Sequence, residues 1–223
     1  MKKLFLSVAF ALCAVCSYSS DWANLEFYRE ANDSVMKLDS SHREIVLLGN
    51  SITYNWACYH GSFLEENHMI GRGISGQTTT HFLARFRQDV LNLKPKTVVI
   101  LGGTNDIAEN AGEYNEELTM NNIQSMVELA KANGIRPVLC TVLPVTQYWW
   151  NKDVPNVQDK IDSLNRRITT YAKENDILLV DYFTPLAMPD RTMNPKYADD
   201  GVHPNLAGYA VMEKLLLTVL SSL

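Results

Sequence analysis

Cysteine is scarce in this sequence, which contains four in 223 residues. Cys13 and Cys16 lie in the first twenty residues, so Cys58 and Cys140 are the two that remain beyond them. Two cysteines do not form the framework of a disulfide-rich domain. Cys140 stands in an apolar run, and we expect a buried free thiol there; a Cys58–Cys140 bond in an oxidising compartment is the alternative. The cysteines, histidines and acidic residues also lack the spacing of a zinc site, so we expect no metal site.

The chain also lacks an excess of basic residues and, beyond residue 20, long apolar runs. The chain has 20 lysines and arginines against 25 aspartates and glutamates, a net charge of −5. Because no basic stripe is present, nucleic acid is not an expected partner. Beyond the first twenty residues no apolar run is long enough to cross a bilayer, so we expect no stable membrane span in the mature chain.

The first twenty residues are organised like a leader. Two lysines precede the apolar run Leu4–Val15, and small or polar residues follow up to residue 20. This pattern predicts a secretory signal over residues 1–20, and therefore export to the periplasm or the medium. Its removal takes away two lysines and no acidic residue, which brings the net charge to −7. A retained N-terminal anchor and a lipid attached to Cys16 are the alternatives, although Val15 is unfavourable before a lipidated cysteine.

The remaining residues, 21–223, are long enough for one domain with a substantial core. They contain five short apolar runs that do not alternate with polar residues. Such runs are typical of strands buried on both faces of a parallel sheet. The runs are Glu44–Gly49, His68–Gly73, Lys96–Gly102, Arg136–Leu143 and Asp176–Val180.

Apolar residues at helical spacing occupy the segments between these runs. They predict helices around residues 82–90, 123–130, 157–171 and 211–219, and a further helix over residues 25–38. Repeated strand–helix units require right-handed crossovers and a sheet that is covered on both faces. We therefore predict a three-layer α/β/α sandwich with a five-stranded parallel sheet in the order of flavodoxin.

Ser51 directly follows the first of the five runs. It is therefore expected at the carboxyl end of a strand, where open α/β sheets place their ligands. A serine hydroxyl becomes a useful nucleophile when a base takes its proton. Of the five histidines, His42 and His68 precede strands and belong at the opposite end of the sheet. His60 and His81 follow strands, but neither has an acid at a spacing that would orient its ring.

His203 does have such an acid. Asp200 precedes it by three residues across Gly201-Val202, so a tight turn can place the carboxylate against the imidazole. A carboxylate in that position holds the ring and stabilises its protonated form. Pro204 then suits the first turn of the helix that follows. Alone, an Asp and a His at this spacing are equally typical of a helix N-terminus; together with Ser51 they favour a base and its orienting acid.

Three further groups can supply hydrogen-bond donors near Ser51. Gly76 can bring a backbone N–H close to a ligand, because glycine has no side chain. Asn105 can offer its side-chain amide after the third run, and Ser51 its own N–H at the start of a helix. Donors of this kind stabilise the oxyanion that forms in acyl transfer. Each block taken singly is equally an ordinary turn or helix cap, but their occurrence after successive strands favours a site.

Four blocks in chain order resemble those of the SGNH hydrolases, also called the GDSL-like lipase/acylhydrolase family. The resemblance covers about residues 44–210 and points to an exported bacterial member of carbohydrate-esterase type. One departure is that the family's usual Gly-Asp-Ser is Gly-Asn-Ser here, so Asn50 keeps the hydrogen-bonding shape without the charge. The blocks are Gly49-Asn50-Ser51, Gly73–Thr79 with Gly76, Gly102–Asp106 with Asn105, and Asp200 with His203.

The resemblance implies a role for each of these residues. Ser51 would be the nucleophile, and His203 the general base oriented by Asp200. The N–H groups of Ser51 and Gly76 and the amide of Asn105 would form the oxyanion hole. The implied reaction is hydrolysis of a carboxylic ester through an acyl-enzyme, without a metal or cofactor.

Aromatic residues near these blocks are candidate substrate contacts. Trp56 lies near the nucleophile, and Tyr148, Trp149 and Trp150 follow the fourth strand. Aromatic faces can stack on sugar rings, which together with the export signal favours removal of short acyl groups, above all acetyl, from a carbohydrate. Asn50 is a further candidate contact. The alternative role of the aromatic residues is to cover the domain edge or an oligomer contact.

Other activities stay open at this point. A lysophospholipase, a thioesterase, or a lipid esterase of the kind that acts on platelet-activating factor is the alternative enzyme. A carbohydrate-binding protein that has lost turnover is the alternative outside enzymes. In each enzymatic case, a small-molecule or glycan ester is the expected partner.

Overall fold

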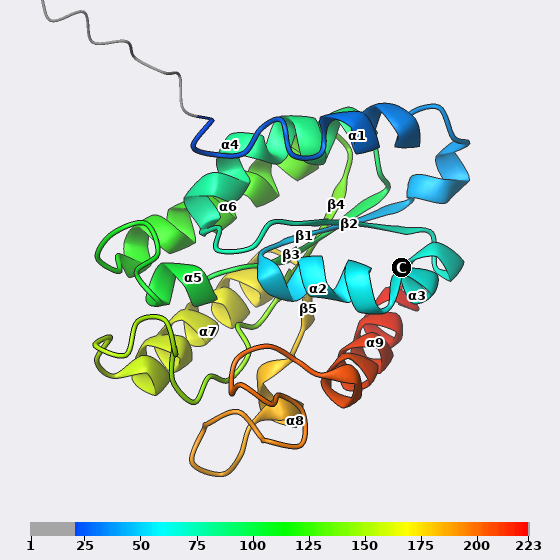
Figure 1. Cartoon of the computed structure of the whole chain (residues 1–223). Coiled ribbons are helices and arrows are strands. Elements are labelled where there is room, and N and C mark those ends of the chain that lie inside the picture. The colour runs from blue at the N-terminus through cyan, green and yellow to red at the C-terminus, as the bar shows by residue number, and fades with distance from the viewer. Residues whose placement is uncertain (1–20, 223) are drawn as a thin grey trace, which may run out of the picture.

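The computed structural model describes residues 21–222, and their centre is a five-stranded parallel sheet (Figure 1). The strand order is β2-β1-β3-β4-β5, which confirms the predicted flavodoxin order. The predicted secretory signal, residues 1–20, lies outside the described residues. The strands are β1 Ile45–Gly49, β2 Met69–Gly73, β3 Thr97–Leu101, β4 Arg136–Cys140 and β5 Leu178–Val180.

Helices cover both faces of the sheet, as the unalternating strands require (Figure 1). One face packs against α4 Thr79–Asp89, α6 Glu116–Ala132 and α7 Val157–Glu174. The opposite face packs against α2 Ser51–Tyr59, α3 Gly61–Glu66, α8 Phe183–Leu186 and α9 Leu206–Leu220. Side chains of successive residues along each strand alternate between these two cores; Leu47 and Leu48 of β1, for example, belong to different ones. The predicted three layers are therefore confirmed. Shorter helical turns complete the order: α1 Arg29–Val35, η1 Ser40–Arg43, η2 Leu91–Leu93 and α5 Thr104–Ile107.

The segment before the first strand differs from the prediction. A helix was expected over residues 25–38, but α1 has seven residues and buries none of them. The segment is held by hydrogen bonds instead: the Tyr28 hydroxyl donates to the carbonyl of Gly73 at 2.5 Å, and the Gln77 amide donates to the carbonyl of Ala23 at 2.8 Å. Val35 packs against one core, but most side chains of residues 25–38 are exposed, so little burial supports a longer helix.

Both cysteines in the described part of the chain are free thiols. Cys140 is buried at the end of β4, as predicted, and Cys58 is exposed on α2. Burial raises the pKa of the Cys140 thiol far above its ordinary value, so it remains protonated and inert. The alternative of a bond between the two is not realised.

A buried ion pair sits between α4 and the carboxyl end of β1. The guanidinium of Arg85 is fully buried and binds the carboxylate of Asp89 at 3.0 Å. It also donates to the backbone carbonyl of Gly49 at 2.9 Å and to the side-chain carbonyl of Gln77 at 2.6 Å. This one side chain therefore joins the end of β1 to the loop that follows β2.

Replacing Arg85 with methionine should strongly destabilise the fold, because the carboxylate of Asp89 would stay buried without its charged partner. We expect the free energy of unfolding to fall by about 3–5 kcal/mol, measured by urea denaturation. Arg87→Met is the matched control, since Arg87 is exposed on the same helix, and should change stability by about 0.5 kcal/mol or less. Equal effects of the two variants would contradict the role of the buried network.

Candidate active site

Ser51 is the first residue of α2, directly beyond the end of β1. Asn50 caps the helix, its side-chain oxygen accepting from the N–H of Ile52 at 3.0 Å. The first N–H groups of a helix have no partner within it, so the N–H of Ser51 points out of the helix start. The dipole of α2 favours negative charge at the same place.

Ser51, His203 and Asp200 form one chain of hydrogen bonds. The Oγ of Ser51 lies 2.9 Å from Nε2 of His203, and Nδ1 of the same ring lies 2.7 Å from Oδ2 of Asp200. An ionised carboxylate can only accept, so Nδ1 carries the proton and Nε2 is free to accept from the serine hydroxyl. The fold thus brings Ser51 within hydrogen-bond distance of His203, which lies 152 positions later in the chain. Asp200 is on the same turn as His203.

The turn that carries His203 is held in place from two sides. Oδ1 of Asp200 accepts from the backbone N–H groups of Val202 at 2.9 Å and His203 at 2.7 Å. Gly201 has a φ of +76°, a conformation that glycine adopts without strain. Its carbonyl accepts from the N–H of Thr146, which ties the turn to the loop after β4.

The pKa of Asp200 is lower than that of an ordinary aspartate. Partial burial raises it, but hydrogen bonds from the His203 ring and from the backbone of His203 and Val202 together outweigh that effect. Asp200 is therefore ionised throughout the neutral range, and its charge is available to stabilise a protonated His203 ring.

Two more predicted residues reach the same place from neighbouring strands. Gly76 follows β2 with a φ of +78°, and it lines the same cavity as Ser51. Asn105 lies in α5 after β3, almost fully buried, and its Nδ2 donates to the carbonyl of Gln77 at 2.9 Å. An amide nitrogen has two hydrogens, so one remains for a ligand.

Asp106 of α5 holds the start of α4 through hydrogen bonds to Thr79. Its carboxylate accepts from the N–H of Thr79 at 3.1 Å and from the Thr79 hydroxyl at 2.5 Å, at the start of α4. Burial raises the pKa of Asp106, although the hydrogen bonds from Thr79 counter it. Its contacts are with the protein, so Asp106 joins α5 to α4 and does not face the pocket.

A cavity of about 410 Å³ contains the predicted reactive groups. None of the described residues that line it carries a fixed charge. Two tryptophans form an aromatic wall, and three asparagines and two serines also line the cavity. The lining residues are Ser51, Asn55, Ser75, Gly76, Asn105, Asn110, Trp149, Trp150 and His203.

Three predicted substrate contacts are wrong, because these side chains are buried elsewhere. Trp56 is 2% exposed and packs in the core between α2 and α9, its indole N–H donating to Glu213 at 3.1 Å. Tyr148 is fully buried with its hydroxyl 3.1 Å from that of Thr104. Asn50 is also fully buried, as a helix cap.

The two neighbouring tryptophans do line the cavity. Trp149 is 59% exposed at its rim, and the Trp150 ring lies 6.2 Å from the ring of His203. Tyr148 and Trp149 are neighbours in the chain, but Tyr148 is buried in the core and Trp149 is exposed. The predicted contact with substrate therefore remains for Trp149 and Trp150.

Asn110 is a site residue that the sequence reasoning missed. Its Nδ2 donates to the carbonyl of Gly76 at 3.0 Å, and its Oδ1 accepts from the indole N–H of Trp150 at 2.8 Å. It thus joins the loop after β2 to the aromatic wall. Nothing in the loop sequence distinguishes it from a turn asparagine, since both partners are distant in the chain.

His60 has an acidic partner that local spacing did not reveal. Its Nδ1 lies 2.8 Å from Glu213 of α9, so the expectation that no acid orients this ring is wrong. Neither residue lines the cavity, and the pair fastens α9 to the end of α2. His81 caps α4 together with Thr78, whose N–H donates to Nδ1 of His81 at 3.2 Å.

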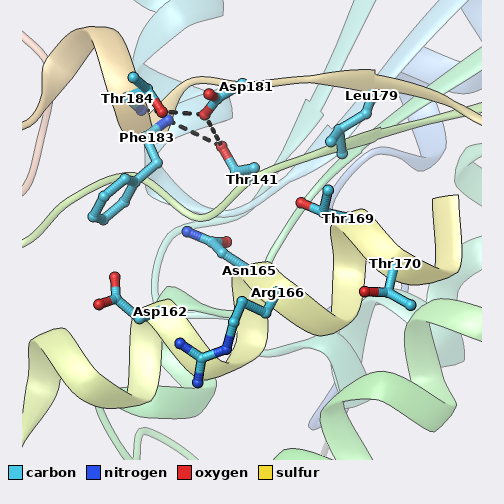
Figure 2. Close-up of a pocket in the computed structure, with 10 residues that line it drawn as sticks. All are labelled: Thr141, Asp162, Asn165, Arg166, Thr169, Thr170, Leu179, Asp181, Phe183 and Thr184. Atoms are coloured by element: carbon cyan, nitrogen blue, oxygen red, sulfur yellow. Dashed lines mark hydrogen bonds between the residues drawn. The ribbon is translucent and has the colours of Figure 1, made fainter. Parts of the chain in front are cut away.

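A separate cavity of about 450 Å³ lies between α7 and the ends of β4 and β5 (Figure 2). The described residues that line it include no serine, cysteine or histidine. The Thr141 hydroxyl accepts from the N–H groups of Tyr182 and Phe183, both at 2.9 Å. Asp181 accepts from the N–H of Thr184 (Figure 2). These polar groups secure the chain after β5.

Residues 21–222 contain neither a cluster of metal-ligating side chains nor a helix suited to cross a membrane. In that range no three His, Cys, Asp or Glu side chains are grouped so that they could hold a metal ion. No helix in the same range has the length and apolar character needed to cross a membrane.

Solved structures of similar proteins share this architecture. A structure from Bacteroides fragilis has a TM-score of 0.88 and 47% identity, and the match covers 91% of this chain and 98% of that one. A GDSL-like lipase from Bacteroides thetaiotaomicron has a TM-score of 0.87 and 45% identity, with 90% of this chain and 99% of that one covered.

Curated relatives are more distant. An acetylxylan esterase from Geobacillus stearothermophilus is 26% identical over 160 residues, which are 67% of this chain and 70% of that protein. The chain spans about a third of the length of two others: 34% of the lipoprotein YqeF of Bacillus subtilis, at 35% identity, and 29% of an acetylxylan esterase of Xylanibacter ruminicola, at 26% identity.

The model of the GDSL-like Lipase/Acylhydrolase family matches residues 47–211, a range that begins within β1 and ends within α9. That range contains all four sequence blocks and every residue of the hydrogen-bond chain from Ser51 to Asp200. The chain therefore belongs to the GDSL-like lipase/acylhydrolase family and is an ester-hydrolysing enzyme.

Proposed function

We propose that the enzyme removes acetyl groups from an uncharged carbohydrate, with Ser51 as nucleophile, His203 as general base and Asp200 as the residue that orients the base. The observation that carries the proposal is the continuous chain of hydrogen bonds from Ser51 through His203 to Asp200, at 2.9 and 2.7 Å. Both distances are within reach for direct proton transfer.

The chemistry follows from the positions of the protons. Nε2 of His203 takes the proton of Ser51 as Oγ attacks the ester carbonyl, and the ionised Asp200 stabilises the protonated ring. His203 then gives this proton to the leaving alcohol oxygen as the C–O bond breaks, which leaves an acetyl group on Ser51. Water, deprotonated by His203, releases acetate and restores the serine hydroxyl.

The negative charge on the attacked carbonyl oxygen needs donors that are already in place. We assign this role to the N–H groups of Ser51 and Gly76 and to the free amide hydrogen of Asn105. The helix start, the left-handed turn and the buried amide each restrict one donor to a fixed direction. Their support is geometric: all three residues line the cavity that contains Ser51 Oγ.

The lining of the cavity supports a sugar ester as the substrate. Its described residues carry no fixed charge, which suits an uncharged alcohol. Trp149 offers an exposed ring face for stacking, and the amides of Asn55 and Asn110 and the hydroxyl of Ser75 are partners for sugar hydroxyls. The relatives named acetylxylan esterases favour acetyl as the acyl group.

We further propose that residues 1–20 are a secretory signal and that residues 21–223 form a single domain. The basic and apolar pattern of the leader supports export. Lipid attachment at Cys16 is the alternative, since one relative is a lipoprotein.

Hydrolysis of p-nitrophenyl acetate by the wild type and by Ser51→Ala tests the enzymatic proposal. The wild type should release p-nitrophenol, and the variant should be slower by about 10³-fold or more, because it lacks the attacking oxygen. Acetate release from acetylated xylan and fatty acid release from lysophosphatidylcholine then compare the substrate classes. Faster turnover of the lipid would overturn the carbohydrate assignment, and equal rates of wild type and variant would remove Ser51 from the mechanism.

Asn105→Ala removes one proposed oxyanion donor. We expect kcat to fall by about 10²–10³-fold with a much smaller change in KM, since the donor acts on charge that develops in the transition state. The thermal midpoint of the variant controls for the lost bond to the carbonyl of Gln77. An unchanged kcat in a folded variant would exclude Asn105 from the oxyanion hole.

Asp200→Asn separates orientation of the base from folding of its turn. The asparagine oxygen can still accept from the N–H groups of Val202 and His203, so the fold should be retained. Its NH₂ group would donate to Nδ1 of His203, which moves the ring proton to Nε2 and blocks acceptance from Ser51. We expect kcat to fall by about 10³–10⁴-fold, with a native circular dichroism spectrum as the control. A variant within tenfold of wild type would contradict the assigned role.

A further inference from the structure

A second cavity adjoins the one that contains Ser51. Its volume is about 560 Å³, and Asn55 and His203 line both cavities. It lies between the carboxyl end of α2 and the start of α9. Its lining residues are Asn55, Tyr59, Asp199, Asp200, His203, Pro204, Asn205 and Leu206.

Two large apolar side chains of this second cavity are open to solvent. Tyr59, the last residue of α2, is 62% exposed, and Leu206, the first residue of α9, is 65% exposed. Both are among the most exposed large apolar residues in the described chain, and neither belongs to the two cores. The fold therefore leaves their apolar surface available to a ligand.

Asn55 stands at the junction of the two cavities, one helical turn after Ser51 on α2. Within the described chain its side-chain amide has no hydrogen-bond partner, whereas the amide of Asn205 is used to cap α9 and to bind Asp199 at 3.0 Å. A ligand that extends from one cavity into the other would pass this amide.

We infer that the second cavity binds the uncharged sugar residue next to the acetylated one, so that the enzyme acts on oligosaccharides. This inference rests on the proposed function. His203 must give its proton to the leaving alcohol oxygen, so the alcohol part of the substrate lies against this ring. The cavity that continues beyond His203 and Asn55 is therefore on the alcohol side, while the small acetyl group stays near the oxyanion donors.

Charge restricts what this second cavity can take. Asp199 and the ionised Asp200 line it, and no lysine or arginine of residues 21–222 does. A uronate or a phosphate would meet like charge at close range. The apolar face of a neutral pyranose fits the Tyr59 ring, and its hydroxyls can donate to Asp199 and bond to Asn55.

Kinetics of Tyr59→Ala on a long and a short substrate test this inference. We expect kcat/KM for acetylated xylotetraose to fall about tenfold more than kcat/KM for p-nitrophenyl acetate, which cannot fill the second cavity. The loss should appear mainly in KM, because stacking is the same in the ground and transition states. Tyr54→Ala is the matched control, since Tyr54 is an exposed tyrosine of the same helix outside both linings; the ratio of the two kcat/KM values should not change.

Leu206→Ser provides a second variant, because the exposed Leu206 lines the same cavity as Tyr59. It should also lower the ratio of kcat/KM for acetylated xylotetraose to kcat/KM for p-nitrophenyl acetate. If both variants leave the ratio at the wild-type value, the second cavity is not a sugar subsite. A wild type that hydrolyses acetylated uronate oligomers as well as neutral ones would equally overturn it. Failure of the proposed function would be seen separately, as absence of Ser51-dependent turnover of p-nitrophenyl acetate.

Discussion

The guanidinium of Arg85 holds together the parts of the chain that supply the oxyanion donors. It is fully buried, and it binds the carbonyl that ends β1, the side chain of Gln77 after β2, and the carboxylate of Asp89. The carbonyl of Gln77 in turn accepts from Asn105, which follows β3. One cation thus connects the ends of three neighbouring strands. A buried charge is tolerated only when it is paired and hydrogen-bonded, so these segments have little freedom to move independently.

The same network extends to the surface through the N-terminal segment. Asn32 donates to Asp89 at 2.8 Å and accepts from Arg72 at 2.8 Å, and the Arg72 guanidinium stacks 4.7 Å from the centre of the Tyr28 ring. Tyr28 closes the network by donating to Gly73 at the end of β2. Residues before the first strand therefore support the donor loops, although they form little regular structure. Preorganised donors are effective because they need no rearrangement during the reaction.

The sequence was sufficient to predict the fold because its signals are repeated. Five unalternating apolar runs predicted the strands within a few residues, and the helical periodicities placed the major helices. The helix predicted over residues 25–38 forms only at Arg29–Val35, because most of the segment is exposed and little burial supports a longer helix. The substrate contacts predicted for Trp56 and Tyr148 were wrong because both side chains are buried. The sequence shows that an aromatic residue lies near the site, but it does not show whether the ring faces solvent or the core.

What the sequence determined by itself is local. The order of the strands and helices, the cap at the start of α2 and the turn from Asp200 to His203 depend on residues a few positions apart, where chain geometry limits the outcomes. Tertiary structure decided contacts across the chain that the sequence did not indicate: His60 with Glu213, and Asn110 with both Gly76 and Trp150. It also decided that Trp149 and Tyr59 face open cavities. These outcomes depend on packing between elements that are distant in the chain. A short stretch of sequence does not specify which surface it will pack against.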